Sequence, residues 1–407
     1  MIRRAAVLLL AAVAACQNGD GGSQRVRRCP APGGGSPAAI EVASSTVRSA
    51  EPWSVEEDLS LGRAFGDSAL EFGFITDITQ GPWGRIYLAD AQALRVSVHD
   101  STGSLVRTLG REGEGPGEFS GPMRLSRRPD DSVRVFDLAL WRETVFDTTG
   151  RHAGTTTLPQ RPRFGQIPAV EYDGEGGIYN LGYGEFRESL LESLGGRVEG
   201  VGRGRVTLDR WQRNRGEWIM LARVPSIRVY FSGGGLRDAP FAPRPLWDAA
   251  SGGVWYADSR HYRLTRLSAA GDTVCRVHVD AEPPRVSRGD RDAYLEGDDL
   301  ADVPDDRRRR VLQRRREMPI PDHRPVLEEL VAAPGGGVWV RPSPETWNAS
   351  PDTVAWHVFS DRGEPVARVR LPRGFHPMRV QPDAVLGVRQ TDTGVDQVVR
   401  YAVIRGG

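Results

Sequence analysis

Short segments in which apolar and polar residues alternate recur along the chain, separated by turns rich in Gly and Asp. The first group is the clearest and reads GRIYLAD (84–90), LRVSVHDSTG (94–103) and SLVRTLG (104–110). Alternation with a period of two is the pattern of a β-strand that buries one face. The sequence therefore predicts an all-β protein made of short consecutive strands.

The same group of segments returns at a nearly constant interval. Ile86 and Val133 hold equivalent places 47 residues apart, and Gly103 and Gly150 show the same offset. Further copies begin at Gly176, Gly252, Gly336 and Asp383. A propeller blade of four short strands with its loops needs about 40–45 residues of chain. Each copy is therefore interpreted as one blade.

These blades are predicted to form a ring. One small sheet cannot bury both of its faces, so the copies must stack around an axis. We predict a six-bladed β-propeller over residues 53–407. The last copy supplies too few strands, and Asp58–Gly66 is predicted to complete it and close the ring. Two packed sheets, the alternative architecture, would not explain the constant offset.

Two intervals between copies are longer than the rest, which predicts insertions near residues 185–240 and 285–328. The first is rich in Gly and Arg. In the second, Asp305 and Asp306 precede a run of arginines, which predicts a short helix, acidic at its start and basic at its end. A solvated helix face is favoured for these arginines over a docking patch.

The first residues have the pattern of an export signal. Arg3 and Arg4 precede a short apolar stretch, Ala5–Ala12, which is too short to span a bilayer. Small residues then lead into Cys16. The tetrad Val13-Ala14-Ala15-Cys16 resembles the bacterial lipobox, which implies that residues 1–15 are a lipoprotein signal peptide and that Cys16 carries lipid.

A lipidated cysteine implies a membrane anchor in the cell envelope. Gln17 stands where an inner-membrane retention signal would place Asp, so the outer membrane is favoured. Residues 16–52 are rich in Gly, Ser, Pro and Ala and are predicted to be a flexible tether. Cys29 and Cys275 could pair in an oxidising compartment, but Cys29 falls in this tether and the pairing stays open.

The segment LGREGEGPGEFSGP (109–122) resembles the linker between blades of NHL-repeat propellers. GRIYLAD followed by R-x-x-V-x-D-x-x-G is also NHL-like, and with the lipobox the chain is similar to six-bladed propeller lipoproteins of environmental bacteria. The resemblance implies the fold and leaves the function open.

The strand before each GRIYLAD-type strand is expected to be innermost and to line the central channel. The channel-lining candidates are Asp77, Arg124, Glu171, Trp247, His376 and Arg379. Partly satisfied rim residues are the favoured interpretation, and a charged funnel that selects a ligand is the alternative. Asp90, Asp137 and Asp258 end equivalent strands, which favours turn capping over a metal site.

No pattern predicts catalytic residues, a metal or a cofactor. The chain lacks HExxH, CxxC, GxSxG and phosphate-loop motifs, and four asparagines are too few for a calcium-dependent lactonase channel. The formal net charge of +1 argues against nucleic-acid binding.

The first functional hypothesis is a non-enzymatic binding or scaffolding propeller that takes a small ligand or an envelope protein. The alternative is an NHL- or lactonase-like hydrolase or lyase acting at the central channel. A third hypothesis is a sensor that passes ligand occupancy to another envelope protein.

Overall fold

The computed structural model describes residues 28–29, 38–62, 71–128, 130–159, 170–173, 176–197, 199–232, 235–296, 300, 303–344, 352–391 and 394–406. Cys16 and the predicted signal peptide lie outside these residues. So do residues 63–66 of the segment predicted to close the ring.

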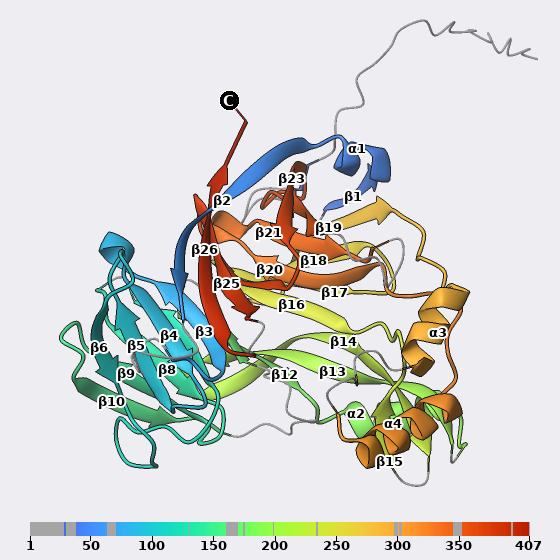
Figure 1. The fold of residues 1–407 in the computed structure, drawn as a ribbon, viewed down its shortest axis with the longest axis horizontal. Helices are drawn as coiled ribbons and strands as arrows, with labels where there is room; N and C mark the ends of the chain where they lie inside the picture. Colours follow the sequence, from blue (N-terminus) through green and yellow to red (C-terminus); the bar gives the residue numbers. More distant parts are fainter. Residues whose placement is uncertain are drawn as a thin grey trace, which may run out of the picture.

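Three of the sheets are built from strands that follow one another in the chain (Figure 1). The first sheet comprises β3 (Ile75–Gln80), β4 (Ile86–Asp90), β5 (Arg95–His99) and β6 (Leu105–Leu109). The second comprises β7 (Met123–Arg127), β8 (Val133–Asp137), β9 (Arg142–Phe146) and β10 (His152–Thr157). The third comprises β11 (Val170–Tyr172), β12 (Ile178–Gly182), β13 (Gly200–Gln212), β14 (Glu217–Ser232) and β15 (Gly235–Asp238).

Two further sheets each incorporate a strand from the N-terminal region. The fourth comprises β16 (Pro245–Ala250), β17 (Gly253–Asp258), β18 (Arg263–Ser268), β19 (Thr273–Asp280) and β1 (Ala38–Ala43). The fifth has eight strands and contains two meanders. The first meander comprises β20 (Leu327–Ala332), β21 (Val338–Pro342), β22 (Thr353–Phe359) and β23 (Pro365–Pro372), and the second comprises β24 (Phe375–Val380), β25 (Ala384–Gln390) and β26 (Asp396–Ile404). Strand β2 (Glu51–Leu61) lies between β23 and β26 and joins the two meanders.

The first strands of successive meanders contact one another in a closed series. Strand β3 contacts β7, β7 contacts β11, β11 contacts β16, β16 contacts β20, and β20 contacts β24. The series closes because β24 contacts β3. Each of these strands overlaps a segment that the sequence predicted to be innermost. The sheets thus surround an axis, and the fold is an all-β propeller.

The hydrophobic core lies between successive sheets rather than in one central mass. Val96 and Val98 of β5 pack with Leu125 and Val135 of the next sheet. Trp255 is fully buried, and its indole Nε1 donates a hydrogen bond of 2.8 Å to the Gly336 carbonyl beyond its own sheet. Apolar residues that alternate along each strand therefore bind neighbouring sheets together.

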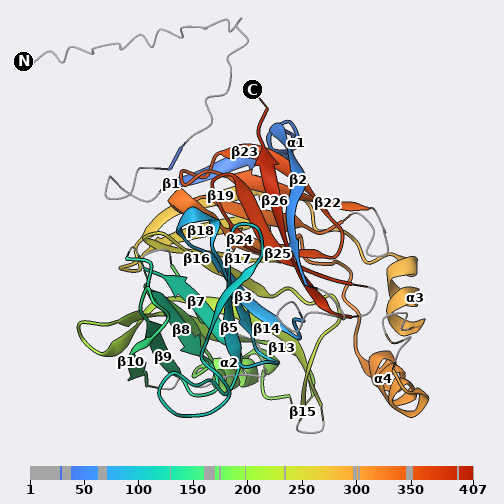
Figure 2. The ribbon, with the colours of Figure 1, turned by 60° about the vertical axis from the view of Figure 1, so that its left-hand side comes forward.

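The N-terminal strand closes the ring, as the sequence predicted, although it begins at Glu51 rather than Asp58. Strand β2 pairs in antiparallel fashion with β26, where Ser60 lies opposite Val399. At its start it pairs in parallel with β23, where Trp53 lies opposite Val369. Figure 2 shows β2 and β26, from opposite ends of the chain, side by side.

Part of the predicted flexible tether is ordered. Strand β1 pairs in parallel with the edge strand β19, and α1 (Ser44–Arg48) follows it. Ile40 and Val42 are buried, so this segment covers apolar surface that edge strand β19 would otherwise leave open. Cys29 and Cys275 form a disulfide, with Cα atoms 5.4 Å apart, which settles the pairing that the sequence left open.

The two predicted insertions differ in kind. Residues 185–240 hold α2 (Phe186–Leu194) and the long hairpin β13–β14, so most of this stretch belongs to the third sheet. Gly202 and Gly204 occupy buried positions of β13, so the apolar side chains that would mark the alternation are missing there. Residues 285–328 hold α3 (Arg288–Glu296) and α4 (Asp305–Glu317). As predicted, α4 begins with acids and ends with arginines, and none of its residues is buried.

The aspartates that end equivalent strands cap turns, as predicted. Asp90 accepts hydrogen bonds from the N–H groups of Gln92 and Ala93, at 3.0 and 3.1 Å. Asp137 accepts hydrogen bonds from the N–H groups of Ala139 and Leu140, at 2.7 and 2.9 Å. These short acceptors orient each turn that leads into the next strand.

Removing the disulfide should destabilise the protein. The bridge spans 246 residues of sequence and restricts the unfolded chain, so Cys29→Ser with Cys275→Ser should lower the free energy of unfolding by about 2–5 kcal/mol. Urea unfolding followed by tryptophan fluorescence measures this change. A reductant should lower the urea concentration at the midpoint of wild-type unfolding and leave the midpoint of the double variant unchanged. Equal wild-type midpoints with and without reductant would contradict the prediction.

Candidate functional site

Four of the predicted channel residues form one ion network at the axis. Arg379 of β24 contacts Asp77 of β3 at 2.7 Å (Nη2 to Oδ2) and Glu171 of β11 at 3.7 Å (Nη1 to Oε2). Arg124 of β7 contacts the same Glu171 at 3.2 Å (Nε to Oε1). Side chains from four inner strands that are distant in sequence thus meet.

Asp77 and Asp248 also tie neighbouring inner strands together through their carboxylates. Asp77 accepts the N–H of Ile78 and that of Leu125 in β7, both at 2.8 Å. Asp248 of β16 repeats this arrangement with Ala249 and with Ala332 of β20, also at 2.8 Å. In this segment the sequence predicted Trp247 as the channel residue, and Asp248 was not predicted. The shared pattern of Asp followed by an apolar residue in an inner strand was the available signal.

Burial shifts the pKa values of several groups in this network. The pKa of Asp248 is raised to about 7, by desolvation first and then by the negative charge of Glu171. Desolvation also raises the pKa of Glu171, although Arg124 and Arg379 oppose it. Burial alone would lower the pKa of Arg379, but the carboxylates around it raise it. Arg379 therefore stays charged, and Asp248 titrates near neutral pH.

A cavity of about 350 Å³ opens onto this network where the inner strands end. Asp248 and Arg379 contribute to its wall. Its other polar side chains come from Thr79, Gln80, Ser126, Arg127, Tyr172, Asp173, Ser251 and Gln381. The cavity is small and polar, and two of its charged side chains already have partners: Arg379 pairs with Asp77 and Glu171, and Asp248 accepts two backbone N–H groups.

The other two predicted channel residues lie apart from the network. Trp247 is partly buried in the apolar core between the third and fourth sheets. His376 is exposed, and its Nδ1 lies 3.8 Å from Oε1 of Glu329, which pairs with Arg341 at 2.6 Å. The Glu329 carboxylate raises the pKa of His376.

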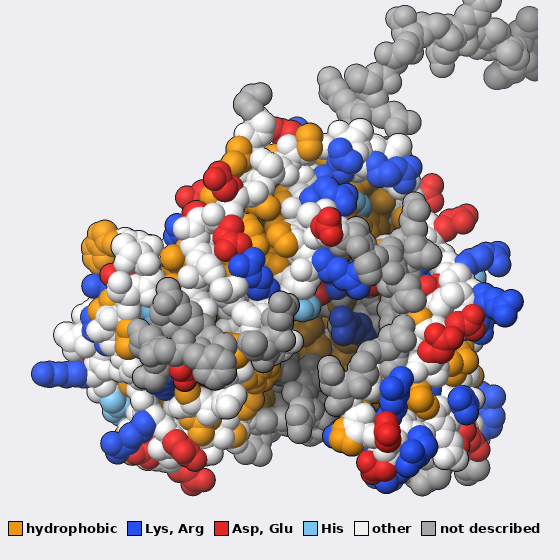
Figure 3. All heavy atoms as spheres, viewed as in Figure 1, with side chains coloured by type: hydrophobic (Ala, Val, Ile, Leu, Met, Phe, Trp, Pro, Cys, Tyr) orange, Lys and Arg blue, Asp and Glu red, His pale blue; other side chains and the backbone are white. Residues whose placement is uncertain are grey.

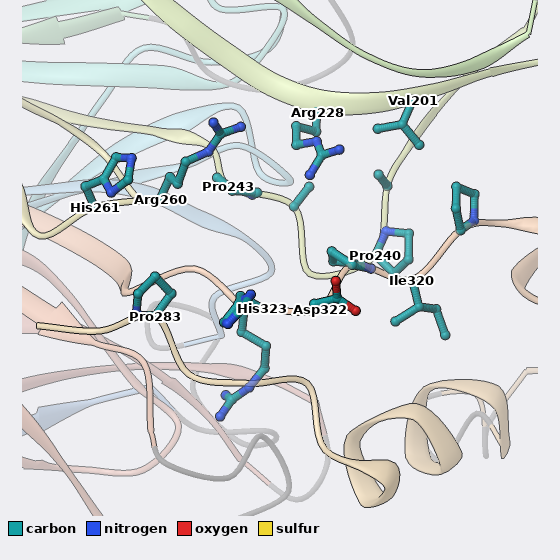
Figure 4. Close-up of a pocket in the computed structure, with 15 residues that line it drawn as sticks. Val201, Arg228, Pro240, Pro243, Arg260, His261, Pro283, Ile320, Asp322 and His323 are labelled. Carbon is teal, nitrogen blue, oxygen red and sulfur yellow. The ribbon is translucent and has the colours of Figure 1, made fainter.

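A larger cavity of about 560 Å³ lies where inner strands begin (Figure 4). Val201 and Arg228 reach it from β13 and β14, and Arg260 and His261 from the turn between β17 and β18. Its remaining wall comes from the loops before β16 and β20 and from the loop after β19, namely Ala239, Pro240, Ala242, Pro243, Pro283, Pro319, Ile320, Pro321, Asp322, His323 and Arg324. No motif joins segments so far apart, which is why this cavity could not be predicted from the sequence.

This cavity is electropositive. Burial lowers the pKa of Arg228, and the nearby charges of Arg260 and Arg203 lower it further. The adjacent Asp258 is held by both terminal nitrogens of Arg203, at 2.8 and 3.0 Å. Among the described residues, no carboxylate forms an ion pair with Arg228. The cavity thus presents a half-buried guanidinium among other guanidinium groups.

The other polar groups of the wall add little negative charge. Asp322 is largely exposed and lies 3.9 Å from Arg291 of α3 (Oδ1 to Nη2). Desolvation lowers the pKa of His261, so its imidazole is neutral at neutral pH. Arg324 is buried at the back of the cavity and lies 3.5 Å from Asp290 (Nε to Oδ2). Figure 3 shows basic and acidic side chains together over α3 and α4, beside this region.

The described part of the chain shows neither a metal-binding cluster nor a membrane-spanning helix. It contains no group of three or more His, Cys, Asp or Glu side chains that could hold a metal ion. It also contains no helix that is long and apolar enough to cross a membrane.

No family model and no curated protein matches the chain. Solved structures resemble it at low identity. A DUF4221 family member from Bacteroides vulgatus is 10% identical with a TM-score of 0.48, covering 88% of this chain and 99% of that one. Virginiamycin B lyase from Staphylococcus aureus is 10% identical (TM-score 0.40; 85% and 99% covered). The calcium-binding protein regucalcin from Agrobacterium tumefaciens is 11% identical (TM-score 0.39; 88% and 97% covered).

Replacing Asp248 should change how stability depends on pH. The pKa of an unfolded Asp is about 3.9, below the value of about 7 for Asp248 in the fold. The folded state therefore holds the proton more tightly, and this residue's contribution to stability falls as pH rises from about 4 to about 7.

Asp248→Asn removes this titration. Between pH 5 and pH 8 the wild type should lose on the order of 1–3 kcal/mol more unfolding free energy than the variant. Urea unfolding at both pH values measures the difference. Identical pH dependence in the two proteins would show that Asp248 is ionised throughout.

Proposed function

We propose that this protein is an exported, lipid-anchored propeller of six blades that binds an anionic small molecule in the cavity beside Arg228. Six apolar cores support the number of blades, because each joins two successive meanders and the last joins β24–β26 to β3 and β4. The eight-stranded sheet then counts as two blades that share the N-terminal strand β2.

The unpaired charge of Arg228 carries the proposal for the ligand. A guanidinium is costly to bury without a partner, and among the described residues the charges of Arg260 and Arg203 that act on it are both positive. An anion bound in the cavity would supply the missing partner through hydrogen bonds with a charged donor, the geometry in which arginine recognises carboxylate and phosphate. The cavity's volume of about 560 Å³ is within the range of about 300–1,000 Å³ usual for small-molecule sites.

The N-terminal sequence supports the location. A positive start, a short apolar stretch and Cys16 fit a lipoprotein signal. The Cys29–Cys275 disulfide fits an oxidising compartment outside the cytoplasm. The outer membrane is the proposed destination, and binding of a ligand or an envelope partner is the proposed role.

Catalysis at the central channel is the second candidate. One observation favours it, because Asp248 has a pKa of about 7 and borders a cavity, as a general acid or base would. However, both of its carboxylate oxygens already accept backbone N–H groups from two strands. The binding proposal is preferred because Arg228 has no such structural task.

Lipid attachment at Cys16 predicts a simple change in fractionation. Cys16→Ala should move the protein from the membrane pellet to the soluble envelope fraction, because the acyl chains provide the anchor. Immunoblots of fractionated cells measure this, with Cys29→Ala as the matched control that keeps the anchor. A Cys16→Ala protein that stays in the pellet after a high-salt wash would contradict lipid anchoring.

The anion proposal predicts that two arginines control affinity. Arg228→Gln and Arg260→Gln should each weaken anion binding about 10-fold or more, because a hydrogen bond to a charged group contributes about 1.5–3 kcal/mol. Isothermal titration calorimetry with glucuronate and, separately, with inorganic phosphate distinguishes a carboxylate from a phosphate ligand.

The exposed Arg151→Gln is the matched control and should bind like the wild type. Thermal unfolding shows whether each variant remains folded. The proposal fails if the wild type binds neither anion, or if Arg228→Gln binds as tightly as the wild type.

A further inference from the structure

A second cavity adjoins the one beside Arg228. It has a volume of about 410 Å³ and shares Ala239, Ala242 and Arg324 with the first cavity. Arg324 is 2% exposed and donates a hydrogen bond of 2.8 Å from Nη2 to the Pro344 carbonyl. One buried guanidinium thus forms part of both walls, so the two cavities lie next to each other, and together they are called the groove.

The second cavity has an aromatic wall. Phe241 and Tyr294 lie with ring centroids 5.8 Å apart, and both line the cavity. The guanidinium of Arg315 lies 4.8 Å from the Tyr294 ring centroid and donates to the Tyr294 carbonyl at 2.9 Å. Phe241 has a φ of 49°, which is unfavourable for a bulky residue. Strained backbone of this kind is concentrated at ligand sites.

Prolines exclude one class of occupant. The wall of the first cavity contains Pro240, Pro243, Pro283, Pro319 and Pro321, and Pro325 lines the second. A peptide that adds as a strand to a sheet edge pairs with free backbone N–H groups, which proline lacks. A ligand recognised by side chains through charge and ring faces suits such walls better than an added peptide strand does.

Helix α4 adds positive charge beside the groove. It carries seven arginines against three acidic residues and leads directly into the wall segment that begins at Pro319. The Arg310–Asp306 pair, at 2.8 Å, neutralises one of these arginines. Such a surface raises the local concentration of a polyanion and speeds its association.

We infer that the groove binds an acidic oligosaccharide, with a carboxylate at Arg228 and Arg260 and a neighbouring sugar ring against Phe241 and Tyr294. This inference rests on the proposed anion site and extends it from one charged group to a chain of sugar units. Each cavity holds one part of the ligand, and buried Arg324 lies between the two parts.

A length series tests the inference. Isothermal titration calorimetry with galacturonate, digalacturonate and trigalacturonate should show an affinity that rises about 10-fold or more from monomer to trimer, as the second cavity fills. Maltotriose, which is neutral, and triglutamate, an acidic peptide, should bind more weakly than trigalacturonate by at least the same factor.

Two variants separate the cavities. Phe241→Leu and Tyr294→Leu should each lower the trigalacturonate affinity about 10-fold and leave that of galacturonate unchanged, which also shows that the first cavity remains intact. Trp83→Leu is the matched control, because Trp83 is an aromatic residue that is 80% exposed and lines neither cavity.

The outcomes distinguish this inference from the proposed function. Equal affinity for monomer and trimer overturns the groove and leaves the single anion site standing. Equal binding of maltotriose or triglutamate overturns the acidic sugar as the ligand class. No binding of galacturonate or of its oligomers overturns the acidic oligosaccharide as the ligand, whereas the anion site itself fails only if glucuronate and inorganic phosphate do not bind either.

Discussion

Closure of the ring by β2 is the constraint on which the rest of the structure depends. A propeller sheet buries its faces only against its neighbours, so an open ring would expose two apolar faces and the edges beside them. Here the strand from the N-terminal region pairs with both β26 and β23. The β1 segment and the Cys29–Cys275 disulfide hold the preceding chain against β19, so the closing strand is anchored at its start.

A closed ring also brings buried charges together at the axis, where they must satisfy one another. Asp77, Glu171 and Asp248 come from three inner strands, and Arg124 and Arg379 come from two others. Buried ions are tolerated when they are paired and hydrogen-bonded. Asp77, Glu171 and the two arginines form ion pairs, and Asp248 accepts two backbone N–H groups. The same ring carries the loops before β16 and β20 to one end, where Arg228 remains without a carboxylate partner among the described residues.

Alternation and spacing predicted the strands, the inner position of each first strand and four members of the axial network. They did so because each blade repeats one local pattern, in which a residue's place determines where it points. The cavity beside Arg228 could not be predicted, since loops from several blades form it and no spacing relates them. Strand β1 was missed because its two buried residues, Ile40 and Val42, lie within a tether-like composition. Asp248 was missed in favour of its larger neighbour Trp247.

Native-state hydrogen exchange along β2 tests the closure most directly. If β2 seals the ring, its amides that pair with β26 exchange as slowly as those of β26 and open with the same denaturant dependence, in one cooperative unit. Fast, independent exchange of the β2 amides, with β23 and β26 still protected, would show that the ring is stable without this strand and would contradict the account.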